Sequence, residues 1–311
     1  MRGRFAPSPT GRLHLGNARS ALLGWLQAKA PGGEFLVRVE DLDRARCKPE
    51  YVDDLFRDLE YLGVTWDEAP VYQSQRGEAY DAALRALSAH GRIYPCFCTR
   101  TEIARAASAP HGPSDEGPRY PGTCAALTPE QAQARAKERA AALRFRPNPG
   151  VTEFVDSLHG AYAQDVDAVV GDFVVRRNDG VASYQLAVVV DDAESRITHV
   201  LRGDDLLSST PRQIQLLQAL GKGVPQYAHV PLLMGEDGKR LAKRAGAFAV
   251  TEVRKAGVPA ERVVGLLAEW SGLSDGAPVR ASELLAQFSL SQVSRAPVPV
   301  SEEKIRARLG I

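Results

Sequence analysis

The sequence predicts an α/β protein built on a doubly wound parallel sheet, and three observations favour this class. A short strand at Arg4, a helix over residues 17–30 and a strand over 34–40 form a β-α-β unit, which implies parallel pairing. The apolar run 183–192 has the character of a buried parallel strand. A further strand over 197–201 ends in polar residues, as strands that lead into a binding site do.

Length and composition describe an ordinary globular protein. The chain has 311 residues and a net charge of +1, so we expect two domains or one with insertions. No apolar run approaches the roughly 20 residues that a membrane span needs, and no signal peptide is visible. We therefore expect a cytoplasmic protein that has no membrane contact and is a monomer. Three of the four cysteines cluster, which favours a metal site over disulfides.

The first loop, residues 5–16, connects a strand to a helix that we expect to begin at Asn17. Backbone N–H groups and the helix dipole make such a loop a natural place for phosphate. Gly16 would let a ligand approach the backbone, and His14 can donate a hydrogen bond to a phosphate oxygen. Taken alone, His14 also fits a surface residue of a proline-rich turn.

Acidic residues follow the next strand, at Glu40, Asp41 and Asp43. Ligands of open α/β sheets bind at the carboxyl ends of strands, so one of these acids is a candidate partner for a substrate ammonium group. The alternative is that they cap the following segment. Helices over 49–62 and 76–89 complete this half of the chain.

The middle of the chain carries a candidate metal site. Cys96 and Cys98 are separated from Cys124 by a loop rich in proline, glycine and serine, and three thiolates can converge on zinc. A fourth ligand is not obvious from spacing, although His111 is one candidate. Three buried free cysteines are the alternative. A helix over 129–143 and strands near 143–145, 152–155 and 171–176 follow.

The last part of the chain offers two more polar clusters. Arg202 follows the strand 197–201, and by itself it would suggest an ion pair with Asp204 or Asp205, just as Tyr184 would suggest a packed strand aromatic. A helix begins near Pro211. The basic loop 239–244 follows an apolar strand and fits the neutralisation of a triphosphate, although a solvated turn has the same composition. The residues after 246 look helical.

Four of these stretches together resemble a known family. Arg-Phe-Ala-Pro-Ser-Pro-Thr-Gly followed by His-Leu-Gly-Asn resembles the HIGH signature of class I aminoacyl-tRNA synthetases, in the form of the glutamyl subgroup. Arg-Val-Glu-Asp-Leu-Asp resembles its Arg-Ile-Glu-Asp-Thr-Asp element, and Leu-Arg-Gly-Asp-Asp-Leu its second half-domain. Residues 239–244 are similar to the KMSKS loop. Asn17, Arg240 and Ala242 depart from the family pattern.

The resemblance implies a Rossmann-like catalytic domain in two halves, with a zinc-bearing insertion and a helical stem. The halves would be 1–95 and 183–245, the insertion 96–182 and the stem 246–311. His14 and Lys243 would be catalytic, and ATP with magnesium would be bound by His14, Gly16, Asn17 and Lys243. The implied glutamate site comprises Arg4, Phe5, Ala6, Pro7, Ser8, Glu40, Tyr184 and Arg202.

Within that site, Arg4 and Arg202 would grip the side-chain carboxylate of glutamate, with Glu40 and Tyr184 at its ammonium group. A guanidinium fork matches a carboxylate, whereas neutral glutamine would leave a buried guanidinium poorly paired.

The cysteine pattern resembles the zinc module of the short glutamyl-Q branch of the family, in which a tyrosine completes the site. This implies one structural zinc on Cys96, Cys98, Tyr120 and Cys124. Members of that branch attach glutamate to queuosine in the anticodon loop of tRNA(Asp). The chain ends soon after the KMSKS-like loop, where longer enzymes carry an anticodon-binding region. The alternatives are a truncated enzyme that charges tRNA(Glu) and a non-catalytic relative that binds tRNA or an amino acid.

Overall fold

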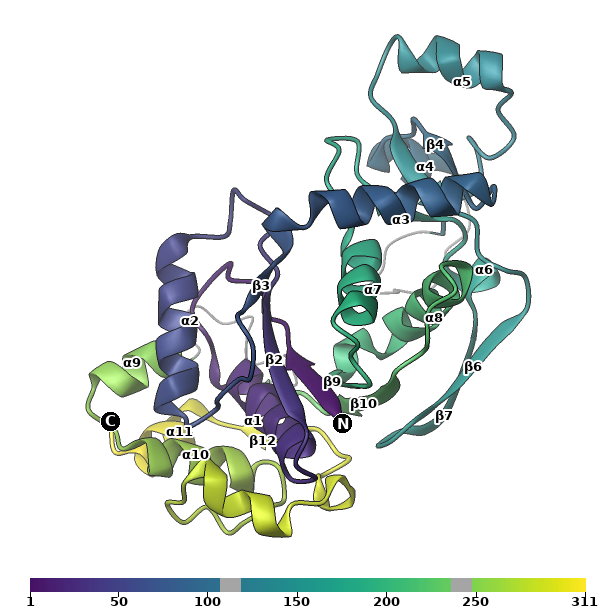
Figure 1. The fold of residues 1–311 in the computed structure, drawn as a ribbon. Helices are drawn as coiled ribbons and strands as arrows, with labels where there is room; N and C mark the ends of the chain where they lie inside the picture. Colours follow the sequence, from purple (N-terminus) through teal and green to yellow (C-terminus); the bar gives the residue numbers. More distant parts are fainter. Residues whose placement is uncertain (107–118, 236–247) are drawn as a thin grey trace.

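The structure is a computed structural model that describes residues 1–106, 119–235 and 248–311 (Figure 1). Two layers of helices flank a central set of mostly parallel strands, and α3 (Gly77–Ala89) crosses between the two halves. Within these residues, no helix is both long and apolar enough to cross a membrane.

The predicted parallel sheet is present, in two pieces that meet at β1 and β9. One piece has the order β1-β2-β3, formed by Arg2–Phe5, Glu34–Val39 and Val71–Tyr72. The other has the order β7-β6-β10-β9, formed by Gly160–Asp165, Val151–Asp156, Gln226–Val230 and His199–Gly203. Only β7 is antiparallel to its neighbour. Next to β9, the backbone N–H of Thr198 donates to the carbonyl of Arg2 at 2.9 Å.

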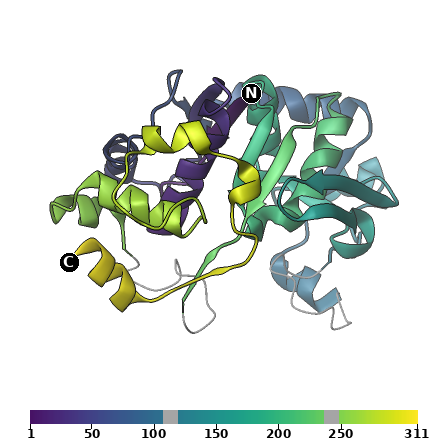
Figure 2. The ribbon, with the colours of Figure 1, turned by 90° about the horizontal axis from the view of Figure 1, so that it is seen from below.

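The main core surrounds α1 (Leu15–Lys29), which is buried along most of its length. The C-terminal helix α10 (Ala260–Glu269) and the 3₁₀ helix Ala281–Gln287 pack directly on α1, as the view from below shows (Figure 2). Helix α2 (Pro49–Tyr61) packs against α9 (Val250–Lys255). Further 3₁₀ helices cover Gln73–Gln75, Asp204–Ser209 and Leu290–Gln292.

One prediction, the strand over 183–192, is wrong, and the second core shows why. The run 183–192 is not a strand but most of helix α7 (Tyr184–Glu194), which packs against α3 and α8 (Thr210–Ala219). Ser183 caps it by accepting a hydrogen bond from the N–H of Leu186. Every residue from Leu186 to Asp192 is buried. A helix buried on all sides shows the same continuous apolar run as a buried strand, so the run alone cannot separate the two.

Two helix boundaries also differ from prediction. Helix α1 begins at Leu15 rather than Asn17, because His14 acts as its N-cap. Helix α5 (Pro129–Ala136) is shorter than the predicted 129–143. A capping box at Thr128 starts α5, but none of its residues is buried, so packing does not extend it.

A smaller antiparallel sheet stands above the second core, with the order β4-β5-β8. Its strands are Ile93–Cys96, Ala142–Phe145 and Phe173–Arg176. Helices α4 (Arg100–Ala106) and α6 (Val166–Val169) lie in the same region.

The C-terminal segment includes a strand that the sequence did not predict. Strand β12 (Val298–Val300) pairs in parallel with β11 (Leu233–Gly235) and is followed by α11 (Glu302–Leu309). This pairing fastens the C-terminal segment to the strand that leads into the basic loop. The loop itself, including Lys243, and His111 lie outside the described residues.

The first prediction concerns the main core. Leu59 on α2 is fully buried, so Leu59→Ala should lower the free energy of unfolding by about 2–5 kcal/mol through lost burial and a residual cavity. The matched control is Glu60→Ala at the exposed neighbouring position, which should stay within about 0.5 kcal/mol of the wild type. Denaturant unfolding measures both, and equal stabilities of the two variants would contradict the assignment of this face to the core.

Candidate active site

A cavity of about 520 Å³ lies at the carboxyl ends of β1, β2 and β9. All the predicted glutamate- and ATP-binding residues that the structure describes line this one cavity. They are Arg4, Phe5, Ala6, Pro7, Ser8, His14, Gly16, Asn17, Glu40, Tyr184 and Arg202. They converge because the ends of neighbouring parallel strands meet at one sheet edge, where the chain leaves β1 in one direction and β9 in the other.

His14 lies at the start of α1 and is held in a defined orientation. Its Nδ1 accepts a hydrogen bond from the backbone N–H of Asn17 at 3.2 Å, which leaves Nε2–H as the donor in the neutral ring. Burial lowers the pKa of His14, against the opposing effect of Asp205. A side chain at position 16 would crowd His14, since a Cβ on Gly16 would lie 3.1 Å from the His14 ring.

Of the three acids after β2, only Glu40 lines the cavity. Asp41 accepts hydrogen bonds from the backbone N–H and the hydroxyl of Ser74, at 2.7 and 2.6 Å. Asp43 accepts from the backbone and the side chain of Arg46. Burial raises the pKa of Glu40, and the guanidinium groups of Arg38 and Arg4 oppose that rise. Glu40 is therefore the acid available to a ligand, whereas the other two hold loops.

Arg4 is paired with an acid that sequence analysis did not single out. Its Nε and Nη2 donate to the carboxylate of Asp192 at 3.2 and 3.4 Å. The buried Arg38 also donates to Asp192 and, at 3.2 Å, to Glu40. Burial by itself would raise the pKa of Asp192, but the two guanidinium groups outweigh it and hold that pKa low. Arg4 thus enters the cavity as a largely neutralised cation.

The neighbouring Asp191 ties the two halves of the molecule together. It is fully buried and accepts hydrogen bonds from Gln73 Nε2 and Tyr80 Oη, both at 2.8 Å, and from Arg76 Nε at 3.1 Å. These partners come from the segment after β3 and from α3, whereas Asp191 lies on α7. The pair of acids at the end of α7 therefore fixes this helix against both the cavity and α3.

Arg202, at the end of β9, is buried but differs from Arg4 in its partners. Its guanidinium donates to His229 Nε2 at 3.0 Å, to Thr210 Oγ1 at 2.8 Å, and more weakly to Tyr184 Oη and the carbonyl of Leu206. Within the described part of the chain, it forms no ion pair with a carboxylate, so the suggested pairing with Asp204 or Asp205 is not found. Among the residues that the structure describes, the Arg202 guanidinium therefore has only uncharged hydrogen-bond acceptors.

Arg19 is a third arginine that lines the cavity, and the sequence analysis missed it. It is 2% exposed, and it donates to Ser271 Oγ at 3.0 Å and to the carbonyl of Pro231 at 2.6 Å. Its Nη2 has no hydrogen-bond partner among the residues that the structure describes. Burial lowers its pKa to about 10, so it stays protonated at neutral pH. One turn after His14, Arg19 adds positive potential to the end of the cavity at the helix N-terminus.

The predicted metal ligands also converge. The sulfur atoms of Cys96, Cys98 and Cys124 lie within 4.8 Å of one another, and the Tyr120 hydroxyl lies 3.4 Å from the Cys96 sulfur and 3.7 Å from that of Cys98. Ligands about 2.3 Å from a tetrahedral zinc ion are separated by about 3.8 Å, so this set fits.

Hydrogen-bond donors surround these ligands. Arg144 Nε donates to the Cys96 sulfur at 3.2 Å, and its guanidinium covers the Tyr120 ring. The N–H of Phe97 donates to the Cys124 sulfur at 3.4 Å, and the N–H of Cys124 donates to the Tyr120 oxygen at 2.8 Å. Gly171 has a positive φ and approaches Tyr120 so closely that a Cβ would lie 2.8 Å from its carbonyl oxygen. Such donors favour deprotonated ligands, as a metal site requires.

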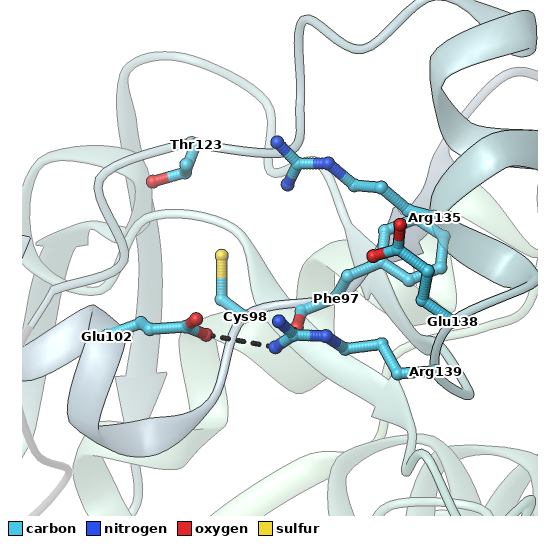
Figure 3. A pocket seen from close by; sticks show the side chains of 7 residues that line it. All are labelled: Phe97, Cys98, Glu102, Thr123, Arg135, Glu138 and Arg139. Atoms are coloured by element: carbon cyan, nitrogen blue, oxygen red, sulfur yellow. Dashed lines mark hydrogen bonds and ion pairs between the residues drawn. The ribbon is translucent and has the colours of Figure 1, made fainter.

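A separate cavity of about 420 Å³ lies beside the cysteines (Figure 3). Cys98 lies between Glu102 and Thr123, while Arg135 and Arg139 extend toward it from the opposite side, and Arg139 pairs with Glu102. Two cations and two acids line the cavity, so it favours neither sign of charge.

Comparison with known proteins defines the class of protein. Residues 1–307 match the family model described as tRNA synthetases class I (E and Q), catalytic domain. The chain belongs to this family of ligases, and its mixed α/β fold with a parallel sheet is that of the family's catalytic domain.

Particular relatives narrow the comparison. The chain is 52% identical to "Glutamyl-Q tRNA(Asp) synthetase" of Symbiobacterium thermophilum, with 99% of this chain and 98% of the relative covered. It is 43% identical to "Glutamate--tRNA ligase 1" of Halorhodospira halophila, of which it covers 66%. Among solved structures, it is similar to glutamate-tRNA synthetase from Elizabethkingia anophelis, with a TM-score of 0.85, 28% identity, and 99% and 69% of the two chains covered.

We predict that the chain binds one zinc ion through Cys96, Cys98, Cys124 and Tyr120. Metal analysis of protein purified without added zinc should find about one ion per chain, and Cys124→Ser should lose it because a thiolate ligand is removed. Cys47→Ser is the matched control, since Cys47 lies outside the cluster and should leave the zinc content unchanged. A folded wild-type protein without zinc would contradict the assignment, and Tyr120→Phe tests the fourth ligand separately.

Proposed function

We propose that this protein activates glutamate with ATP as glutamyl-adenylate and transfers the glutamyl group to queuosine in the anticodon loop of tRNA(Asp). The observation that carries the substrate assignment is the buried guanidinium of Arg202, which has no acidic partner within the described residues. A buried cation is costly unless an anion pairs with it, so the cavity favours an anionic ligand.

The glutamate side chain fits that requirement. Its carboxylate would bind Arg202, with help from the part of Arg4 that Asp192 leaves free. Its ammonium group would lie against Glu40, whose carboxylate also lines the cavity, with the Tyr184 hydroxyl nearby. A cavity that is lined by both a carboxylate and a guanidinium matches a ligand that carries both charges. Phe5, Ala6, Pro7 and Ser8 would shape the wall between them.

ATP would bind at the other end of the same cavity, at the N-terminus of α1. Gly16, Asn17 and the Nε2–H of His14 would face the phosphates, and magnesium would accompany ATP as part of the substrate. The α-carboxylate of glutamate attacks the α-phosphate, and pyrophosphate leaves. His14 and Lys243 would stabilise the charge that develops on the phosphates, and Arg19 adds to the positive potential there.

The second step is an acyl transfer. A hydroxyl of queuosine attacks the carbonyl carbon of the adenylate, an ester forms and AMP leaves. The similarity to "Glutamyl-Q tRNA(Asp) synthetase" over nearly the full length of both chains supports this acceptor. An anticodon loop also suits recognition, because single-stranded bases can be splayed out and read.

The remaining parts would support this chemistry. We propose that residues 96–182 form an insertion with a structural zinc between the halves 1–95 and 183–245, with 246–311 as a stem. The protein would act as a monomer in the cytoplasm, where tRNA is available.

We predict ATP–pyrophosphate exchange that depends on glutamate, with glutamine a much poorer substrate. Lys243→Ala should slow the exchange about 10²- to 10³-fold, as removal of one charge-stabilising group from a preorganised site typically does. Lys222→Ala, at an exposed position outside the cavity, is the control and should retain the wild-type rate. Equal exchange rates with glutamate and glutamine would refute the assignment of this cavity as a glutamate pocket. An undiminished exchange rate in Lys243→Ala would show that Lys243 has no role in the reaction.

The identity of the acceptor can be tested with a short RNA in place of a whole tRNA. An anticodon stem-loop of tRNA(Asp) that contains queuosine should accept labelled glutamate, because the nucleophile lies in the loop, whereas the same loop with guanine should not. Full-length tRNA(Glu) serves as the comparison. Efficient charging of its 3′ end would replace this proposal by that of a truncated glutamyl-tRNA synthetase.

A further inference from the structure

Behind Arg202, away from the cavity, lies a buried polar group of three side chains. His229 and Thr210 are 0% exposed and Asp156 is 1% exposed. They come from β10, from the start of α8 and from the end of β6, so the fold brings them together from distant parts of the sequence. None of them lines the cavity.

The hydrogen bonds of this group fix the tautomer of His229. Its Nδ1 lies 2.6 Å from the Asp156 carboxylate, which can only accept, so Nδ1 carries the proton. Asp156 is itself held by the N–H groups of Leu158 and His159, both at 2.9 Å. The other ring nitrogen, Nε2, is then an acceptor, and it receives the Nε–H of Arg202 at 3.0 Å.

The second contact of Arg202 in this group is with Thr210. The hydroxyl accepts from Nη2 at 2.8 Å, so Nε and Nη2, two of the three guanidinium nitrogens, are bound by the group. Within the described parts of the chain, Nη1 has a single, weaker contact, to Tyr184 Oη at 3.4 Å, and so remains for a ligand. Because both acceptors are neutral, they orient the guanidinium without pairing its charge. Arg4 shows the opposite arrangement, since the charged Asp192 accepts from two of its nitrogens.

We propose that Asp156, His229 and Thr210 are positioning residues that hold Arg202 in register with the substrate carboxylate and thereby set the preference for glutamate over glutamine. This inference rests on the proposed function, in which Arg202 binds that carboxylate. A direct ion pair at the same place would hold Arg202 as firmly but would cancel the charge that distinguishes a carboxylate from an amide.

The neutral state of His229 is part of this arrangement. Burial lowers its pKa to about 4, with Arg202 and His159 acting in the same direction and Asp156 opposing them. The ring of Tyr227 stacks on it at 6.1 Å between centroids. A protonated ring would direct an N–H at the Arg202 Nε–H, so the KM for glutamate should show no His229 titration near the ordinary value of 6.5.

The first test compares His229→Asn with His229→Gln in ATP–pyrophosphate exchange. The asparagine amide can still donate to Asp156 but cannot reach Arg202, whereas the longer glutamine can present its carbonyl oxygen to Arg202. We expect His229→Asn to raise the KM for glutamate about 10-fold or more, while kcat and the KM for ATP change little. The ratio of kcat/KM for glutamate to kcat/KM for glutamine should fall. His229→Gln should recover much of the loss.

The second test uses Thr210→Val, which keeps the shape but removes the hydroxyl, and Thr210→Ser, which keeps the hydroxyl. Thr210→Val should raise the KM for glutamate and lower the preference over glutamine, and Thr210→Ser should lie near the wild type. If thermal unfolding shows that His229→Asn does not fold, the comparison of Thr210→Val with Thr210→Ser tests the proposal by itself.

Two results would overturn the proposal while leaving the proposed function intact. One is a wild-type KM for glutamate and wild-type selectivity in Thr210→Val and in any folded His229→Asn. The other is a loss that affects kcat and the KM for ATP as much as the KM for glutamate, which indicates a general structural role. A wild-type protein without glutamate-dependent exchange would instead refute the proposed function itself.

Discussion

The cavity depends on the way in which buried charges are paired. Asp192 pairs with both Arg4 and Arg38, Glu40 pairs with Arg38 as well, and Asp191 accepts hydrogen bonds from Gln73, Arg76 and Tyr80 in and before α3. Desolvated ions are costly unless paired, so these contacts are what allows several arginines to lie so close together. Among the described residues, by contrast, Arg202 has only neutral partners. The electrostatic character of the cavity therefore follows from which guanidinium is left without an acid.

The parallel sheet makes this pairing possible. Many cavity residues, such as Arg4, Glu40, Tyr184 and Arg202, lie near the end of a strand or in the first turn of a helix, where side chains are free of the core and backbone N–H groups are free of the helix. Asp192 of α7 reaches the cavity-lining Arg4 because that helix packs against α3 and α8. The β12–β11 pairing then brings the C-terminal segment against the same edge, close to the start of the basic loop.

The group of Cys96, Cys98, Tyr120 and Cys124 depends on different contacts. These four candidate ligands lie in a region with a small core, and the contacts of Arg144 with Cys96 and Tyr120 bring a positive charge to groups that would have to be anionic to bind zinc. A bound ion would substitute for the apolar packing that a short antiparallel sheet lacks. The cavity beside it is lined by two arginines and two glutamates among the described residues.

The sequence alone determined the parallel α/β class, the helices that carry clear periodicity or caps, and a set of residues that lie together along one cavity, because motifs at strand ends are local signals; Arg19 was missed. It also singled out the three cysteines and Tyr120, which the fold brings close together. Only the tertiary structure decided that 183–192 is a helix, since burial on all sides removes the periodicity that separates helix from strand. The same holds for the partners of the arginines. Val-Asp-Asp was visible at 190–192, but which guanidinium these acids neutralise, and that Arg202 meets His229 instead, depends on contacts between residues far apart in the chain.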